Sequence, residues 1–163
     1  MLEERDGWFV VNVQGAHWWA NSTFGRICSF EMRGRFQQTG IHLALLEPGK
    51  PNCRYHREDA QEDFLVLSGE CLLLVNGEER RLKAWDFVHC PPGVSHVLVG
   101  AGEGPCAVLM IGHRPEQEQL WYPKNELAAR HGAEAPEPTA DPKVAYSDVP
   151  AREEVEPPAW PIG

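Results

Sequence analysis

Two stretches of the sequence decide the fold. Residues 49–69 read GKPNCRYHREDAQEDFLVLSG, and residues 86–96 read DFVHCPPGVSH. Side chains alternate across a β-strand, so positions two apart share one face. His56 and Glu58 therefore point the same way. Glu62 can join them from the next strand after a short turn.

A second histidine completes the pattern. His96 follows a Pro-x-Gly turn about 40 residues after His56, in another expected strand. Two imidazoles and one or two carboxylates that converge inside a β-structure make a candidate site for a first-row metal, and iron, zinc, manganese and nickel all accept such sets. The competing interpretation is a pair of core histidines satisfied by hydrogen bonds. A buried carboxylate without a cationic or donor partner costs several kcal/mol, which favours the metal.

Short apolar segments separated by Gly and Pro surround these stretches. Thirteen of the 15 glycines precede residue 113. Asn76-Gly77 predicts a two-residue hairpin turn. With no helical period in this region, we expect an all-β sandwich or barrel. The segments predicted as strands are Trp8–Val13, Ile27–Phe30, Ile41–Glu47, Phe64–Leu67, Cys71–Val75, Glu79–Leu82, Phe87–Cys90, Val94–Val99 and Ala107–Ile111.

Composition excludes several classes of partner. The 163 residues carry a formal net charge of −9, so we expect neither nucleic acid nor membrane surfaces as partners. No apolar run approaches the roughly 20 residues that span a bilayer. The first residues lack the order of a signal peptide, and the five cysteines are scattered without a C-x-x-C pair. These features predict a cytoplasmic protein.

The pattern changes after Gly112. We expect a helical turn at Glu116–Leu120 and a short helix at Lys124–His131 that Gly132 ends. Residues 133–163 contain seven prolines and have seven acidic against two basic residues, so this segment cannot form its own core. It is either disordered or docked on the barrel, and its apolar residues favour docking; these are Tyr146, Val149 and Trp160.

At the quoted residues the sequence resembles the cupin superfamily. That family's first motif is G-x5-H-x-H-x3/4-E-x6-G; here six residues separate Gly49 from His56, and Glu62 and Gly69 keep the family spacing. In the second motif, G-x5-P-x-G-x2-H-x3-N, the matching residues are Pro91, Gly93 and His96, whereas Trp85 and Gly100 replace the first and last positions. The resemblance implies a double-stranded β-helix, or jelly-roll barrel, with a short C-terminal helix and a Pro-rich tail.

We accordingly divide the chain into four parts. Residues 1–34 form N-terminal strands that pack as an arm on the barrel, and residues 35–112 form the cupin barrel. Residues 113–132 form a short helical segment, and residues 133–163 form the acidic, extended tail.

The resemblance implies that His56, Glu62 and His96 are metal ligands. Glu58 stands where the family usually has another histidine, and three alternatives stay open. Glu58 ligates the metal as a fourth group, or it acts as a catalytic base or substrate contact, or the site has lost its metal. The ion would be Zn, Fe or Mn, with Zn slightly preferred.

Two functions follow from these residues. The first is a small metalloenzyme acting on a small polar metabolite, by dioxygenase-type or isomerase- or epimerase-type chemistry. The second is a barrel that binds a sugar-like ligand without turning it over, with a structural metal or none. By strand alternation we expect His42, Phe64, Val66 and Leu98 to line the pocket. Exposed sheet edges and the strand at Trp8–Val13 predict a homodimer.

Overall fold

The smaller sheet is organised by the predicted hairpin. The computed structural model describes residues 2–159. Asn76 and Gly77 have φ angles of 48° and 83°, the positive values that a tight hairpin turn requires. The turn joins β8 (Glu70–Val75) to β9 (Glu78–Lys83), and β11 (His96–Ala101) pairs with the other edge of β8.

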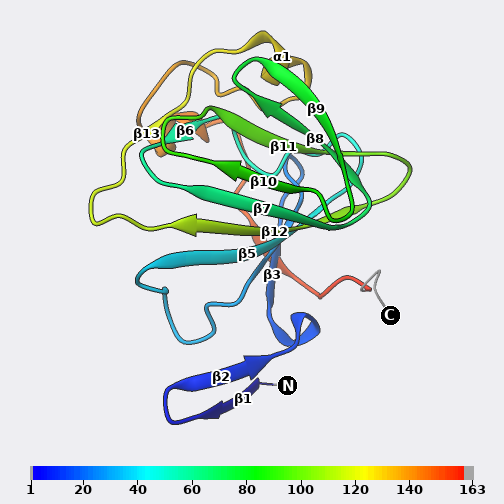
Figure 1. Cartoon of the computed structure of the whole chain (residues 1–163), viewed down its shortest axis with the longest axis vertical. Helices are drawn as coiled ribbons and strands as arrows, with labels where there is room; N and C mark the ends of the chain where they lie inside the picture. Colours follow the sequence, from blue (N-terminus) through cyan, green and yellow to red (C-terminus); the bar gives the residue numbers. More distant parts are fainter. Residues whose placement is uncertain (1, 160–163) are drawn as a thin grey trace.

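The larger sheet has seven antiparallel strands in the order β10-β7-β12-β5-β4-β3-β14 (Figure 1). All five strands that the sequence predicted in this sheet form. Phe87–Cys90 has the predicted bounds, and the ends of the other four shift by one or two residues. The bounds are β10 (Phe87–Cys90), β7 (Glu62–Ser68), β12 (Cys106–His113), β5 (Thr39–Leu46), β4 (Arg26–Ser29), β3 (His17–Ala20) and β14 (Glu153–Val155).

The main core lies between the two sheets. Strands of the larger sheet contribute buried residues such as Leu46, Phe64 and Val108, and the smaller sheet contributes Leu73 and Leu98. Burial of this apolar surface provides the main free energy that holds the sheets together. The chain is therefore all-β and has the jelly-roll architecture that the sequence predicted.

The N-terminal residues divide between an arm and the barrel. β1 (Leu2–Arg5) and β2 (Trp8–Val11) form a hairpin that projects from the barrel in Figure 1. A 3-10 turn, η1 (Val13–Gly15), follows the hairpin. β3 and β4 then belong to the larger sheet, so the barrel begins before residue 35.

The segment after β12 is less helical than we expected. α1 (Glu126–Arg130) begins at the capping residue Asn125, and Gly132, with φ of +69°, lies just after it. The predicted helical turn at Glu116–Leu120 does not form. Instead β13 (Leu120–Trp121) pairs with β6 (Arg57–Glu58), because the open edge of β6 supplies hydrogen-bond partners.

The tail docks on the barrel as far as β14, which ends at Val155. α2 (Pro142–Ala145) begins with the Asp141 side chain as its cap, a helix that the Pro-rich composition did not predict. β14 then extends the larger sheet beyond β3. Trp160 lies outside the described residues. No helix within residues 2–159 is long and apolar enough to cross a membrane.

Candidate metal centre

The two predicted histidines face each other across an antiparallel bridge. The backbone N–H of His56 donates to the carbonyl of His96 at 3.2 Å, and the N–H of His96 donates back at 2.8 Å. Directly opposed residues in such a pair place their side chains on the same face. The two imidazole ring centroids are consequently 5.1 Å apart.

Backbone carbonyls fix how each ring presents its nitrogens. Nδ1 of His56 lies 2.9 Å from the carbonyl oxygen of Arg54, and Nδ1 of His96 lies 2.9 Å from that of Val94. A carbonyl can only accept, so each Nδ1 carries a proton and donates it. Each Nε2 is thereby aimed at the centre, in the orientation that metal-ligating histidines adopt.

Glu62 brings its carboxylate to the same point from the first position of β7. Its Oε2 is 2.7 Å from Nε2 of His96 and 3.5 Å from Nε2 of His56. The three donor atoms all lie within 4.8 Å of one another. Glu62 pairs with Gly112 of β12, where an added Cβ would lie 3.8 Å from the carboxylate, an ordinary van der Waals contact.

The electrostatics of the three residues favour a cation between them. Burial would raise the pKa of Glu62, but the two imidazoles hold that pKa well below its usual range. Burial would lower the pKa of His96, but the Cys90 thiol and Glu62 raise it to about 10. The pKa of His56 is likewise raised against the effect of burial, by Cys53 and Glu62. The buried carboxylate of Glu62 therefore stabilises positive charge beside it.

The donor set also fits a metal geometrically. Oε2 of Glu62 and Nε2 of His96 are buried, and neither has an aligned hydrogen-bond partner among residues 2–159, even though the two atoms form a close ion pair. Two imidazole nitrogens and one carboxylate oxygen are a ligand set for Zn, Fe or Mn.

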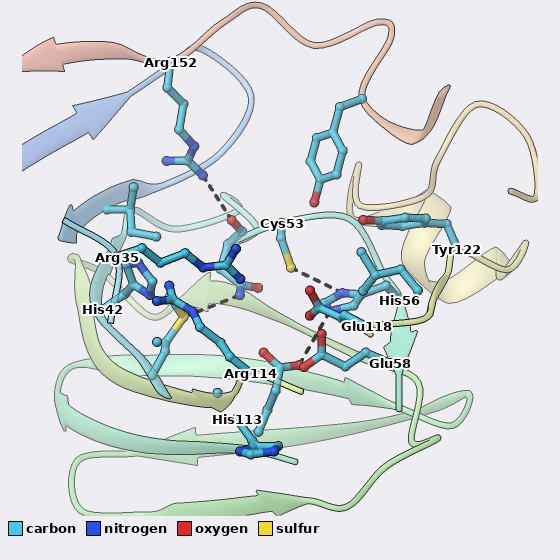
Figure 2. Close-up of a pocket in the computed structure, with 18 residues that line it drawn as sticks. Arg35, His42, Cys53, His56, Glu58, His113, Arg114, Glu118, Tyr122 and Arg152 are labelled. Atoms are coloured by element: carbon cyan, nitrogen blue, oxygen red, sulfur yellow. Dashed lines mark hydrogen bonds and ion pairs between the residues drawn. The ribbon is translucent and has the colours of Figure 1, made fainter. Parts of the chain in front are cut away.

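Glu58 lies outside this group of three donor atoms but lines the same cavity. Its side chain is buried, and Figure 2 shows it near His56. Burial, the charge of Glu62 and a hydrogen bond with Glu118 raise the pKa of Glu58 to about 8. A carboxyl group in that range can both accept and donate a proton near neutral pH.

The cavity has a volume of about 490 Å³ and is lined by two parts of the chain. His42 lines it, as strand alternation predicted. The other three predicted lining residues, Phe64, Val66 and Leu98, belong to the core between the sheets. Their side chains alternate correctly, but the face that they share is the sheet-to-sheet interface and not the cavity.

Sequence reasoning missed the residues that close the cavity. Glu118, Tyr122, Tyr146 and Arg152 line it from the C-terminal strap, which we define as residues 114–155. Tyr146 was expected only as a docking anchor. The strap has no motif or period that could have placed these side chains at the site.

One buried arginine holds the strap in place. The side chain of Arg54 donates to the carbonyls of Glu134 at 2.7 Å, Ala145 at 3.1 Å and Gly132 at 3.4 Å. It also forms an ion pair with Asp148 at 2.5 Å. Because Arg54 is two residues from His56, the strap is tied to the segment that carries this candidate ligand.

Comparisons with known proteins agree with this architecture. The cupin domain family model matches residues 42–112. A sugar phosphate isomerase of the cupin superfamily from Silicibacter pomeroyi is 26% identical, with 60% of this chain and 64% of that chain covered and a TM-score of 0.54. A protein from Acidithiobacillus ferrooxidans is 31% identical, with 52% of this chain and 55% of that chain covered and a TM-score of 0.49, so this chain spans less than two thirds of the length of either relative. No curated protein matches the sequence.

Two more distant structures share the fold alone. The polyketide cyclase RemF from Streptomyces resistomycificus is 13% identical, with 67% of this chain and 82% of that chain covered and a TM-score of 0.57. A predicted oxalate decarboxylase from Thermotoga maritima is 18% identical, with 65% of this chain and 99% of that chain covered and a TM-score of 0.56. Both motifs, the jelly roll and the family match agree, and residues 42–112 form a cupin domain.

Proposed function

We propose that the cupin domain holds a divalent metal ion through His56, Glu62 and His96 and catalyses isomerase-type proton transfer on a small polar metabolite. The observation that carries this proposal is the group of two imidazole nitrogens and one carboxylate oxygen, all within 4.8 Å of one another, beside a cavity that also contains the separate carboxyl group of Glu58. The Silicibacter relative, whose name is sugar phosphate isomerase, supports the same reaction class.

The metal would supply one element of the chemistry. A bound divalent ion polarises a carbonyl or hydroxyl oxygen of a substrate. Zinc is our first expectation, since two imidazoles and one carboxylate are a known zinc ligand set, and iron or manganese would also fit the donors.

Glu58 would move the proton. In this proposal its carboxylate takes a proton from the hydroxyl-bearing carbon beside the substrate carbonyl and delivers it to the former carbonyl carbon. The hydroxyl proton moves to the former carbonyl oxygen, so the reaction needs no oxidant or reductant. The buried position of Glu58 in the cavity, outside the ligand group, is what supports this role over that of a fourth ligand.

The direct test combines metal content with proton exchange. Elemental analysis of protein purified without chelator should give about one metal ion per chain. Incubation in deuterium oxide with a panel of aldoses, ketoses and their phosphates should label substrate carbon, detected by proton NMR. Glu58→Gln should keep the metal and lose the labelling. Glu103→Gln, an equal change on an exposed loop, is the matched control.

Each departure from this pattern overturns a defined part of the proposal. Absence of metal after reconstitution removes the metalloenzyme. Metal loss in Glu58→Gln makes Glu58 a ligand. Labelling that survives in Glu58→Gln excludes it as the base. Sugar binding without any labelling would favour the non-catalytic binding barrel, and oxygen uptake would favour a dioxygenase.

Homodimer formation and a cytoplasmic location stay predictions. Trp8 and Val10 are 46% and 58% exposed on the projecting hairpin, an apolar surface that pairing with a second copy would cover. Light scattering should then give about twice the 18.3 kDa mass of one chain.

A further inference from the structure

The cavity has a cationic side that the metal centre does not explain. In a chain with a net charge of −9, three arginines line one cavity, and they are Arg35, Arg114 and Arg152. Figure 2 shows them on the opposite side of the cavity from His56 and Glu58. Arginine is the side chain best suited to bind carboxylate and phosphate oxygens.

Arg114 is already neutralised. Its guanidinium forms an ion pair with Glu31 and donates to the carbonyl of Phe36 at 2.7 Å. The hydrogen bond from Arg114 is also the main cause of the lowered pKa of Glu31. Arg114 therefore has a structural role, which is to fasten the loop that carries Arg35.

Arg152 is held in place but is not neutralised. It donates to the carbonyls of Gly25 at 2.9 Å and Asn52 at 3.3 Å, and it stacks over the ring of Phe24 at 5.8 Å. No carboxylate within residues 2–159 forms an ion pair with it. The backbone bonds fix the direction of the guanidinium and leave its charge and its other N–H donors for a ligand.

Arg35 adds a second uncompensated charge. Its side chain extends into the cavity in Figure 2, and across the described part of the chain it has no ion pair. Its neighbour Arg33, by contrast, pairs with Glu4 and points elsewhere. Two free guanidinium groups in one cavity repel each other unless an anion lies between or beside them.

The pKa of His42 responds to the positive charges in the cavity. Burial lowers its pKa, the charges of Arg114 and Arg152 lower it further, and Glu31 acts in the opposite direction. The imidazole is therefore neutral beside the arginines and can donate or accept a hydrogen bond without adding to the repulsion.

We propose that Arg152 and Arg35 form an anion-binding subsite that holds a phosphate or carboxylate group of the substrate. As a statement about substrate it rests on the proposed function, because the reacting carbons would then lie between this subsite and Glu58. Anion binding itself requires neither the metal nor catalysis.

Calorimetric titration of the full chain with inorganic phosphate, and separately with acetate, tests the subsite. Arg152→Gln and Arg35→Gln should each weaken binding of the preferred anion by about tenfold or more. Arg33→Gln removes the same charge two residues away and should change binding less than about twofold. Arg35 is exposed and its side chain has no ion pair among residues 2–159, so Arg35→Gln remains informative if Arg152→Gln folds poorly.

The metal-free form separates this proposal from the function above. His96→Ala should lose metal and catalysis but bind the anion as tightly as wild type. Anion binding that disappears in His96→Ala, survives in both arginine variants, or is undetectable in wild type overturns the subsite. Anion binding that depends on the arginines while no substrate carbon exchanges its proton leaves the subsite and overturns the isomerase.

Discussion

The two walls of the cavity are built in different ways. On the barrel wall, His56, Glu62 and His96 stand on paired backbone, where inter-strand hydrogen bonds fix each donor atom. On the strap wall, Tyr122, Tyr146 and Arg152 come from short elements. These are positioned by a few long-range contacts, of which the bonds from Arg54 are the most buried. The position of the barrel wall is therefore set by the sheet backbone, whereas the position of the strap wall depends mainly on the contacts of Arg54.

The largest effect should follow from breaking the barrel wall. His96→Ala removes a buried donor and leaves Glu62 facing one imidazole, so metal affinity should fall on the order of 100-fold or more. Elemental analysis after dialysis measures this directly. His89→Ala, on the exposed end of β10 where His89 pairs with Asp63, is the control and should keep its metal. Equal metal in both variants would contradict the assignment.

The next largest effect should follow from releasing the strap. Arg54→Ala leaves three carbonyls and Asp148 without their donor, and the free energy of unfolding should fall by about 3 kcal/mol or more. Urea denaturation measures the loss, and limited proteolysis should cut first within residues 132–148. Arg26→Ala removes a half-exposed pair with Glu47 and should cost less than about 1 kcal/mol. Similar losses of stability in the two variants would contradict the assignment of Arg54 as the anchor of the strap.

A smaller loss of stability should follow from adding a Cβ to a glycine in a barrel strand, compared with a glycine in a loop. Gly100 replaces the last residue of the second motif, and a Cβ there would lie 2.2 Å from the carbonyl oxygen of Glu47. Gly100→Ala should therefore lower the free energy of unfolding by about 1–3 kcal/mol. Gly104→Ala, where nothing lies within 4 Å, should leave stability nearly unchanged or slightly higher. Thermal denaturation of both variants measures the difference, and equal melting temperatures would contradict the prediction.

The smallest effect concerns the end of the strap. Val155 pairs with Trp18 and packs, partly buried, against the core cluster beside the larger sheet. Val155→Ala should cost about 1 kcal/mol and speed amide hydrogen exchange in β14 ahead of the barrel strands. Val10→Ala on the exposed hairpin should change monomer stability by less than about 0.5 kcal/mol. Exchange in β14 that matches the central strands would contradict separate opening of the strap.

The sequence predicted most of the barrel because local signals and tertiary structure agree there. The Asn76-Gly77 turn, the period-two strands and the two motifs all indicate the same jelly roll, and they bring His56, Glu62 and His96 together. Alternation failed for Phe64, because it states which residues share a face but not whether that face meets a second sheet or a cavity.

The conformation of the strap depends on tertiary contacts and could not be predicted from local sequence. Glu116–Leu120 has a composition that allows a helical turn, but the open edge of β6 offers hydrogen bonds that an isolated turn cannot match. Arg152 is 96 positions from His56 in the sequence, and no local pattern relates them. The amino-acid sequence by itself determined the barrel and its candidate metal ligands, since strand period and turn chemistry are local. Only the folded chain determined which charges face those ligands, because that depends on where a buried arginine anchors the C-terminal strap.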